Sequence, residues 1–340
     1  MNSTIRAWAA QRTGGPLEPY EYDPGLLGAE EVEISVEHCG VCYSDLAFIG
    51  SEWSPTTYPI VPGHEVVGRI TALGDNAKGL SIGQRVGVGW YAGSCTHCHP
   101  CIRGEQNLCA QRQPTIVGRH GGFADRLRAH WMWSIPLPEQ LDPAVSGPLM
   151  CGGLTVFNPF LLNGVRPTDR VGVIGIGGLG HLALQFARAW GCEVTAFTSS
   201  AAKHDEAKAL GAHRVVSSTD AGAMKKSAGS IDFLISTVRA PLDWGAVLET
   251  LAPKGRLHIV GVTTEPVPII VRPHLIAWQR SISGSSTGSP GVLATMLGFV
   301  ARHRIAPHVE HFPMSRVNDA IAHLRSGNAR YRVVLDADFS

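Results

Sequence analysis

The segment around residue 175 restricts the possible folds of this chain more than any other. Val171-Gly172-Val173-Ile174 is a continuous apolar run, which is typical of a parallel strand buried on both faces of its sheet. The sequence Gly175-Ile176-Gly177-Gly178-Leu179-Gly180 follows directly. Residues 179–190 then carry apolar side chains at helical spacing, so that one face of a helix would be buried. A strand, a glycine-rich turn and an amphipathic helix in this order predict a βα unit of a parallel sheet.

The same alternation of strands and helices continues to about residue 271. Strands are expected at 194–197, 214–216, 233–235 and 256–260, and helices at 201–210 and 243–251. Regular alternation of this kind predicts a doubly wound α/β sheet.

Residues 28–150 have a different texture, rich in glycine and proline and with short alternating runs. Such runs have the period of half-buried strands and predict a barrel-like β domain. The mixed pattern after about residue 275 suggests that the tail returns to this first domain. A chain of 340 residues is about twice a typical domain in length. We therefore expect one domain at 1–150, a second at 151–275, and a return of 276–340 to the first.

Charge and composition exclude several classes of partner. The chain has 29 Lys and Arg against 28 Asp and Glu and no basic run, which argues against nucleic acid or an anionic membrane surface. Residues 1–11 lack the apolar core of a signal peptide, and no stretch approaches the roughly 18 apolar residues of a membrane span. The expected location is the cytoplasm. There the eight cysteines would be reduced, so clustered cysteines would indicate metal ligation.

The glycine-rich turn matches the G-x-G-x-x-G pattern of dinucleotide-binding sites. Gly175 would permit the tight turn, Gly177 would let the backbone approach a pyrophosphate, and Gly180 would allow close packing of helix on strand. Gly178 and Leu179 lie where the helix N-terminus would offer its amides to phosphates. In a chain with 39 glycines, an ordinary strand–turn–helix is the alternative.

The end of the next strand bears on the choice of cofactor. NAD sites usually place an acid about 20 residues past the glycine pattern, where it binds the ribose 2′-hydroxyl. Here Thr198, Ser199, Ser200 and Lys203 follow the strand, and the first acid is Asp205. Hydroxyls and an ammonium suit a 2′-phosphate, which favours NADP. The alternative is that Lys203 is a solvated helix residue.

Half of the cysteines fall within fifteen positions: Cys95, Cys98, Cys101 and Cys109. Four thiolates at this density predict a closed tetrahedral zinc site with a structural role. His97 and His99 lie between the cysteines and could replace one of them. An iron–sulfur cluster is the alternative, although nothing else in the sequence indicates electron transfer.

A second set of candidate ligands is dispersed along the chain. Cys42, His64 and Cys151 would form the Cys₂His set of a catalytic zinc with one open position. Spacing alone does not justify this grouping. Cys39 and Cys42 also form a CxxC pair of the redox type, and His64 could be a core or turn histidine.

The order of these motifs resembles that of the zinc-containing medium-chain dehydrogenases, over essentially the whole chain. The resemblance rests on the segment from Cys42 to Asp45, on Gly63-His64-Glu65, on the four cysteines and on the glycine-rich turn. Residues 121–124, 284–289 and 329–332 are similar to the cinnamyl-alcohol dehydrogenase branch. Residues 171–180 and 312–315 are most similar to bacterial NADPH-dependent broad-range aldehyde reductases.

The resemblance implies a GroES-like catalytic domain, a Rossmann NADP-binding domain, an active site between them and a homodimer. It assigns Cys42, His64 and Cys151 to a catalytic zinc, with Glu65 as an alternative or neighbouring ligand, so that two zinc ions are expected per chain. Asp45 would orient the His64 ring, and Thr155 would pack on the nicotinamide.

The implied reaction interconverts aldehydes and primary alcohols by hydride transfer with NADP(H), mainly as aldehyde reduction of broad specificity. Ser44 would pass a proton to the product oxygen. The sequence departs from the family at Tyr43, often His or Arg there, and at Ala47, often the histidine that ends the proton relay. We expect water to replace that histidine, entering over the small Ala47 side chain.

The substrate is expected to be a small aldehyde or alcohol in an apolar pocket walled by Trp53 and Trp90, although either tryptophan could be core. Ser286 replaces a bulkier residue of some relatives, which argues against strict cinnamyl specificity. A polyol or secondary-alcohol dehydrogenase is the alternative among enzymes. A non-catalytic zinc- and NADP-binding redox sensor is the alternative of another class.

Overall fold

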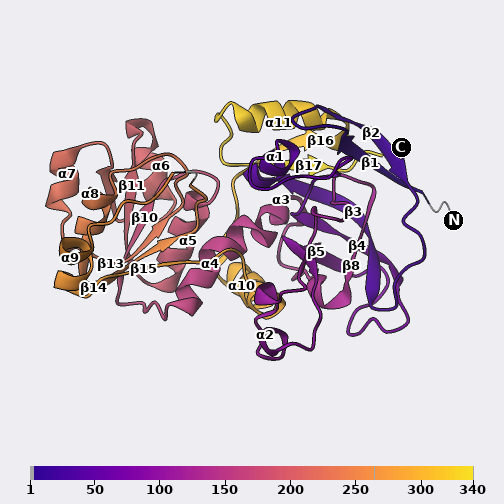
Figure 1. The fold of residues 1–340 in the computed structure, drawn as a ribbon, viewed down its shortest axis with the longest axis horizontal. Coiled ribbons are helices and arrows are strands. Elements are labelled where there is room, and N and C mark those ends of the chain that lie inside the picture. Colours follow the sequence, from indigo (N-terminus) through magenta and orange to yellow (C-terminus); the bar gives the residue numbers. More distant parts are fainter. Residues whose placement is uncertain (1–3, 264, 340) are drawn as a thin grey trace. The chain divides into compact units, whose positions relative to one another are not determined.

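A computed structural model describes residues 4–263 and 265–339 of the chain. The chain divides into two compact units (Figure 1). Unit 1 comprises Met1–Leu154 and Thr287–Ser340, and unit 2 comprises Thr155–Ser286. The boundaries expected from the sequence were 150 and 275. The second boundary lies later in the structure because residues 281–284 form one more parallel strand of the unit 2 sheet.

Unit 1 is built on a seven-stranded sheet with the order β16-β17-β3-β4-β5-β9, in which β8 also pairs with β3. The strands are β3 (Glu31–Val41), β4 (Val66–Leu73), β5 (Arg85–Val88), β8 (Arg126–His130), β9 (Ile135–Pro136), β16 (Val309–Pro313) and β17 (Arg332–Asp336). Among the strand pairs described for this sheet, β16 and β17 are parallel and the others are antiparallel. A hairpin of β1 (Ile5–Ala10) and β2 (Leu17–Tyr22) adds to the unit. The expected β-rich domain is confirmed.

The core of unit 1 lies between this sheet and short helices. Side chains of β3 such as Val32, Ile34 and Val36 alternate into the core, because successive strand residues face opposite sides. Helix α11 (Val317–Arg325) buries Val317, Ala320 and Ile321, which share one face at i, i+3 and i+4. The other helices of the unit are α1 (Tyr43–Ile49), α2 (His99–Ile102), α3 (Pro143–Ser146) and α10 (Pro290–His303).

Unit 2 is a doubly wound sheet of six parallel strands. The strands are β10 (Arg170–Ile174), β11 (Glu193–Thr198), β12 (Arg214–Ser217), β13 (Ile231–Ser236), β14 (Leu251–Ile259) and β15 (Ser281–Gly284). Their order in the sheet is β12-β11-β10-β13-β14-β15, which is the Rossmann order 3-2-1-4-5-6. The predicted fold class is therefore confirmed, and every strand expected after residue 170 is present.

Helices cover both faces of this sheet (Figure 1). They are α4 (Gly152–Leu162), which begins in unit 1, α5 (Gly180–Trp190), α6 (His204–Ala209), α7 (Ala221–Lys226), α8 (Trp244–Glu249) and α9 (Val271–His274). Helix α5 buries Leu182, Ala183 and Phe186 on the face predicted from their spacing. The expected helix at 201–210 is a 3₁₀ turn at Ala201–Lys203 followed by α6.

None of the single helices in the described part of the chain is long and apolar enough to cross a membrane. The pair Pro143–Met150 and Gly152–Leu162, bent by 53°, passes only on combined length and composition. Its apolar residues include Leu149, Phe157 and Phe160, which are buried as in an ordinary core helix.

Candidate metal centres and cofactor site

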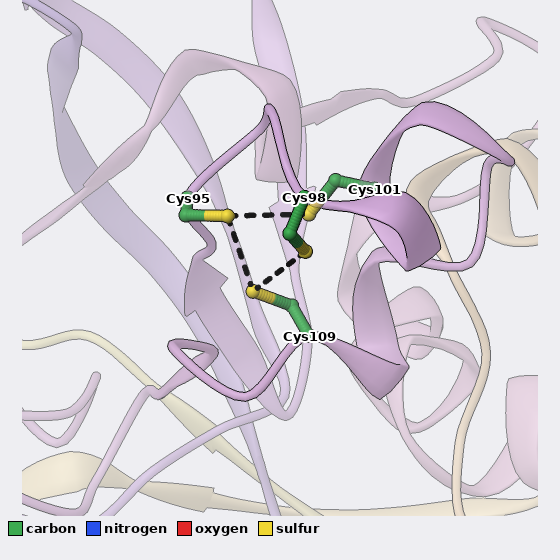
Figure 2. A group of neighbouring side chains, drawn as sticks. All are labelled: Cys95, Cys98, Cys101 and Cys109. Carbon is green, nitrogen blue, oxygen red and sulfur yellow. Dashed lines mark hydrogen bonds between the residues drawn. The ribbon is translucent and has the colours of Figure 1, made fainter.

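The four clustered cysteines of unit 1 converge on one point. They lie on the loop before α2, on α2 itself and just after the 3₁₀ turn Gln106–Leu108, and Figure 2 shows their sulfurs directed toward one another. Sγ of Cys109 lies 3.6 Å from Sγ of Cys95 and 3.7 Å from that of Cys98, and Cys95 and Cys101 are 3.9 Å apart. A tetrahedral zinc with Zn–S bonds of about 2.3 Å separates its sulfurs by about 3.8 Å. The donor set therefore fits a closed zinc site.

Backbone amides favour ionised sulfur at Cys95 and Cys109 of this lobe (residues 95–109), whereas burial and the neighbouring sulfurs raise the pKa of the Cys98 thiol. The amide of Gln111 donates to Sγ of Cys109 at 3.3 Å. The backbone amide of His97 lowers the pKa of the Cys95 thiol to about 6. The group of possible metal ligands consists of the four cysteines, and neither His97 nor His99 is a member of it.

The dispersed candidates also meet in unit 1. Cys42, His64, Glu65 and Cys151 each offer a ligand atom within 4.8 Å of the others. Cys42 is the N-cap of α1, His64 and Glu65 precede β4, and Cys151 precedes α4. Gly63 allows the chain to reach His64 with φ +99°, and a Cβ there would lie 2.6 Å from Phe123. Cys39, the other half of the CxxC pair, is fully buried and belongs to the hydrophobic core.

The His64 ring is held in one orientation by Asp45. Oδ1 of Asp45 accepts from Nδ1 of His64 at 2.9 Å and from the Gly63 amide at 2.9 Å. Oδ2 accepts from the amide of Cys42 at 2.9 Å. When Nδ1 carries the only ring proton, as metal binding requires, the imidazole presents the lone pair of Nε2 to the cluster. Nε2 is fully buried and has no hydrogen-bond partner among residues 4–263 and 265–339. This orphan acceptor fits a metal ligand.

The pKa values of the two thiols and the imidazole in this cluster depend on one another. A bound cation would take the place of the protons between them. A hydrogen bond from Cys151 and the neighbouring His64 hold the pKa of Cys42 well below its usual value. The same bond to Cys42 and burial raise the pKa of Cys151. Burial lowers the pKa of His64, but Asp45 and Cys42 outweigh it and the net shift is upward. The cluster thus favours the thiolate form of Cys42, a residue that is only partly exposed.

Arg332 also belongs to this centre, although it was not among the site residues expected from the sequence. It begins β17, is 5 % exposed, and forms an ion pair with Glu65, which is 0 % exposed. Burial raises the pKa of Glu65 to about 7, against the lowering effect of the arginine. A charged residue directly before the apolar strand residues Val333 and Val334 was the available signal.

Aromatic side chains extend from the His64 ring. The Trp90 ring stands edge-to-face to it at 4.9 Å, Phe48 lies 5.6 Å from Trp90, and Trp53 lies 6.0 Å from Phe48. Trp53 and Trp90 are partly exposed and pack against the core. The structure therefore brings both tryptophans to one aromatic row and adds Phe48, which sequence reasoning missed.

The residues of the expected proton path lie at the start of α1. Oγ of Ser44 is 3.7 Å from Sγ of Cys42. The Tyr43 hydroxyl donates to Glu52 at 2.5 Å. Ala47 is 0 % exposed on the buried side of the helix, so the expectation that water enters over its side chain is wrong.

The glycine-rich turn of unit 2 joins β10 to α5 as predicted. Gly175 has φ +90°, and a Cβ on Gly180 would lie 1.9 Å from the Gly175 carbonyl oxygen, so both positions require glycine. A Cβ on Gly177 would meet nothing within 4 Å, which leaves the backbone there open to a ligand. Gly178 and Leu179 complete the turn before α5 begins.

The hydroxyls and the lysine after β11 lie beside this turn. Thr198 ends β11, and its hydroxyl accepts from the amide of Ser200 at 3.2 Å. Ser199 is exposed, whereas Lys203 is half-buried. Nζ of Lys203 donates to the carbonyl of Ile176 at 2.7 Å, so it contacts the turn rather than pointing only into solvent. Thr155 is buried in α4.

These sites define a class of protein, and comparison with known families agrees. Residues 28–139 match the alcohol dehydrogenase GroES-like domain, and residues 178–302 match the zinc-binding dehydrogenase domain. The chain belongs to the zinc-containing medium-chain alcohol dehydrogenases, in the branch of the cinnamyl alcohol dehydrogenases.

Particular relatives narrow the class. The chain is 54 % identical to aldehyde reductase AdhA of Synechocystis sp. over 97 % of this chain and 98 % of that protein. Its fold matches a cinnamyl alcohol dehydrogenase from Sorghum bicolor with a TM-score of 0.94 at 36 % identity, covering 98 % and 97 % of the two chains. It also matches CAD from Helicobacter pylori, complexed with NADP(H), with a TM-score of 0.90 at 28 % identity and 99 % coverage of both. The chain is thus an alcohol or aldehyde oxidoreductase, and the expectation of an enzyme rather than a sensor is confirmed.

Proposed function

We propose that the chain is a zinc-dependent, NADP(H)-linked enzyme that mainly reduces aldehydes of broad structure to primary alcohols. The observation that carries the proposal is the buried centre of unit 1, in which Nε2 of His64 has no partner among the described residues and two cysteine sulfurs lie within reach of it. A buried imidazole with an unused lone pair beside two thiols is the donor set of a catalytic zinc.

In this proposal Cys42, His64 and Cys151 would hold the metal, whose chemistry when bound would be Lewis-acid polarisation of a carbonyl, with the hydride coming from a bound NADPH. Asp45 fixes the tautomer of His64, and Arg332 holds Glu65 as a paired carboxylate at the edge of the centre. Ser44 holds the proton that the product oxygen takes up, because its hydroxyl is adjacent to Cys42.

The residues after β11 favour NADP(H) as the cofactor. Thr198, Ser199 and Ser200 offer hydroxyls, Lys203 offers an ammonium, and no carboxylate precedes Asp205. Lys203 contacts the Ile176 carbonyl, so its charge is close to the turn that would receive the pyrophosphate. The NADP(H) complex of the Helicobacter pylori relative supports the same choice. Thr155 is proposed to pack on the nicotinamide.

The aromatic row of Trp90, Phe48 and Trp53 favours a particular class of substrate. Trp90 contacts the ring of His64, so the apolar wall begins at the proposed metal and continues through Phe48 to Trp53. An aldehyde with an apolar or aromatic body would be favoured there. The similarity to an aldehyde reductase supports the reductive direction.

We further propose two zinc ions per chain and a homodimer. The four-cysteine lobe would hold the second, structural zinc. The dimer proposal rests on unit 2, where β15 is an edge strand of the sheet and the segment leading to it exposes Ile270, Ile276 and Trp278 by 67 %, 67 % and 48 %. Edge strands beside apolar patches are typical of protein contacts.

Zinc counting and a cofactor comparison together test the proposal. The purified chain should carry about two zinc ions per chain, one of which is lost in Cys42→Ser and the other in Cys101→Ser. Cys42→Ser should abolish turnover and leave the protein folded. Cys101→Ser, in contrast, should not combine loss of turnover with an intact fold. An aldehyde panel with NADPH and NADH should give the higher kcat/KM with NADPH. A wild-type chain with one zinc that Cys42→Ser leaves unchanged would refute the catalytic centre.

A further inference from the structure

Thr237 lies outside the glycine-rich sequence yet contacts it directly. It follows the carboxyl end of β13, the neighbour of β10 in the sheet. The Thr237 hydroxyl donates to the carbonyl of Gly175 at 2.6 Å and lies 3.2 Å from the carbonyl of Ile174. Its amide donates to Ile174 as well, at 3.0 Å. Thr237, at the end of the adjacent strand, thus fixes the backbone at Ile174 and Gly175, where the turn begins.

The next two carbonyls of the turn are held by other side chains. Nζ of Lys203 donates to Ile176 at 2.7 Å. Nδ1 of His181, in the first turn of α5, lies 3.1 Å from the carbonyl of Gly177, which also accepts the His181 amide. Successive carbonyl oxygens from Ile174 to Gly177 therefore all have partners on the protein side.

The amides of the same peptide units are left for a ligand. In a trans peptide the N–H points opposite to the C=O, so holding the Gly175 carbonyl inward directs the Ile176 amide outward. Within the described residues, the amides of Ile176, Gly177 and Gly178 donate to no carbonyl or side chain. Unused amides directed outward at a helix N-terminus are a phosphate-binding arrangement.

We infer that Thr237 is a positioning residue for the cofactor: its hydroxyl fixes the Gly175 corner so that the turn presents its amides to the pyrophosphate. The inference rests on the proposed use of a nicotinamide dinucleotide but not on NADP over NAD, because the pyrophosphate is common to both. The space at this corner is small. A Cβ on Gly175 would lie 2.9 Å from the Thr237 hydroxyl and 2.6 Å from Val238, so the corner packs directly against this strand end.

The test is cofactor binding by the whole zinc-loaded protein, measured by NADPH and NADH fluorescence without substrate. Thr237→Val and Thr237→Ala should each weaken both cofactors by the same roughly 3- to 10-fold, the size of one neutral hydrogen bond. Thr237→Ser keeps the hydroxyl and should bind within about twofold of the wild type. Zinc content and the KM for the aldehyde should not change.

Thr250→Val is the matched control. The Thr250 hydroxyl is buried in the same unit and donates to the carbonyl of Val247 at 2.7 Å, away from the turn. Thr250→Val should lower the melting temperature of the protein but should not change its affinity for the cofactor. Wild-type cofactor binding by folded Thr237→Ala would overturn the inference. Tighter binding of NADH than NADPH by the wild type would instead refute the proposed cofactor choice and leave Thr237 standing. Faster amide exchange at residues 175–178 in the cofactor-free Thr237→Ala protein is the expected independent signature.

Discussion

Replacing Asp45 by Asn would remove one negative charge behind His64, a proposed metal ligand, and would hardly change the shape of the side chain. The carboxylate is 0 % exposed and accepts three hydrogen bonds, two on Oδ1 from His64 and Gly63 and one on Oδ2 from the amide of Cys42. An asparagine can keep Oδ1 in place. Its NH₂ group then faces the Cys42 amide, so a donor meets a donor.

The size of the effect follows from these contacts. One hydrogen bond to a charged group is worth about 1.5–3 kcal/mol, and its loss is uncompensated in a buried place. Loss of a carboxylate behind a metal-binding histidine lowers metal affinity by about 10- to 100-fold. We expect Asp45→Asn to weaken zinc at the Cys42 site by that factor and to lower kcat/KM with it.

Competition with a chelator on the wild type and Asp45→Asn measures this directly, with the four-cysteine zinc as an internal reference. Asp142→Asn is the control, because Asp142 caps α3 in the same unit and accepts from the Ala144 amide at 3.0 Å without touching either cluster. The control should keep both zinc affinities. An Asp45→Asn protein whose two zinc ions leave as in the wild type would refute the argument that Asp45 orients His64.

Three further predictions concern single residues. Lys203→Ala should reduce the preference for NADPH over NADH by about 1.5–3 kcal/mol, measured as a ratio of kcat/KM values, whereas Lys208→Ala on the exposed side of α6 should not. Ser44→Ala should slow aldehyde reduction roughly 10²- to 10⁴-fold if protonation limits the rate, and unchanged reduction would mean that the proton comes from elsewhere. Burial and then Arg256 lower the pKa of His258 from 6.5 to about 4, so the unfolded chain binds the extra proton first. The free energy of unfolding should therefore fall as pH drops from about 6.5 to 4, by up to about 3 kcal/mol. His258→Gln should remove that part of the slope in urea titrations, and an identical slope would contradict it.

Local patterns were sufficient for the elements of unit 2 and for one metal site. The run Val171 to Ile174, the glycines after it and the spacing on α5 each act through neighbours in the chain, so the βα unit could be predicted from the sequence. The same holds for Cys95, Cys98 and Cys101, which lie too close in sequence to be far apart in space.

What the sequence alone determined was therefore local: strand and helix periods, glycines that a turn requires, and ligands on one short lobe. The tertiary structure decided what depends on contacts between distant segments. Glu65 and Arg332 are 267 residues apart in the chain, yet they form one buried ion pair because β17 joins the sheet beside β3. It also decided that Ala47 faces the core and that Thr237 holds Gly175, since a single sequence does not reveal which faces meet. Side-chain periodicity fixes which residues share a face, and only packing fixes what that face touches.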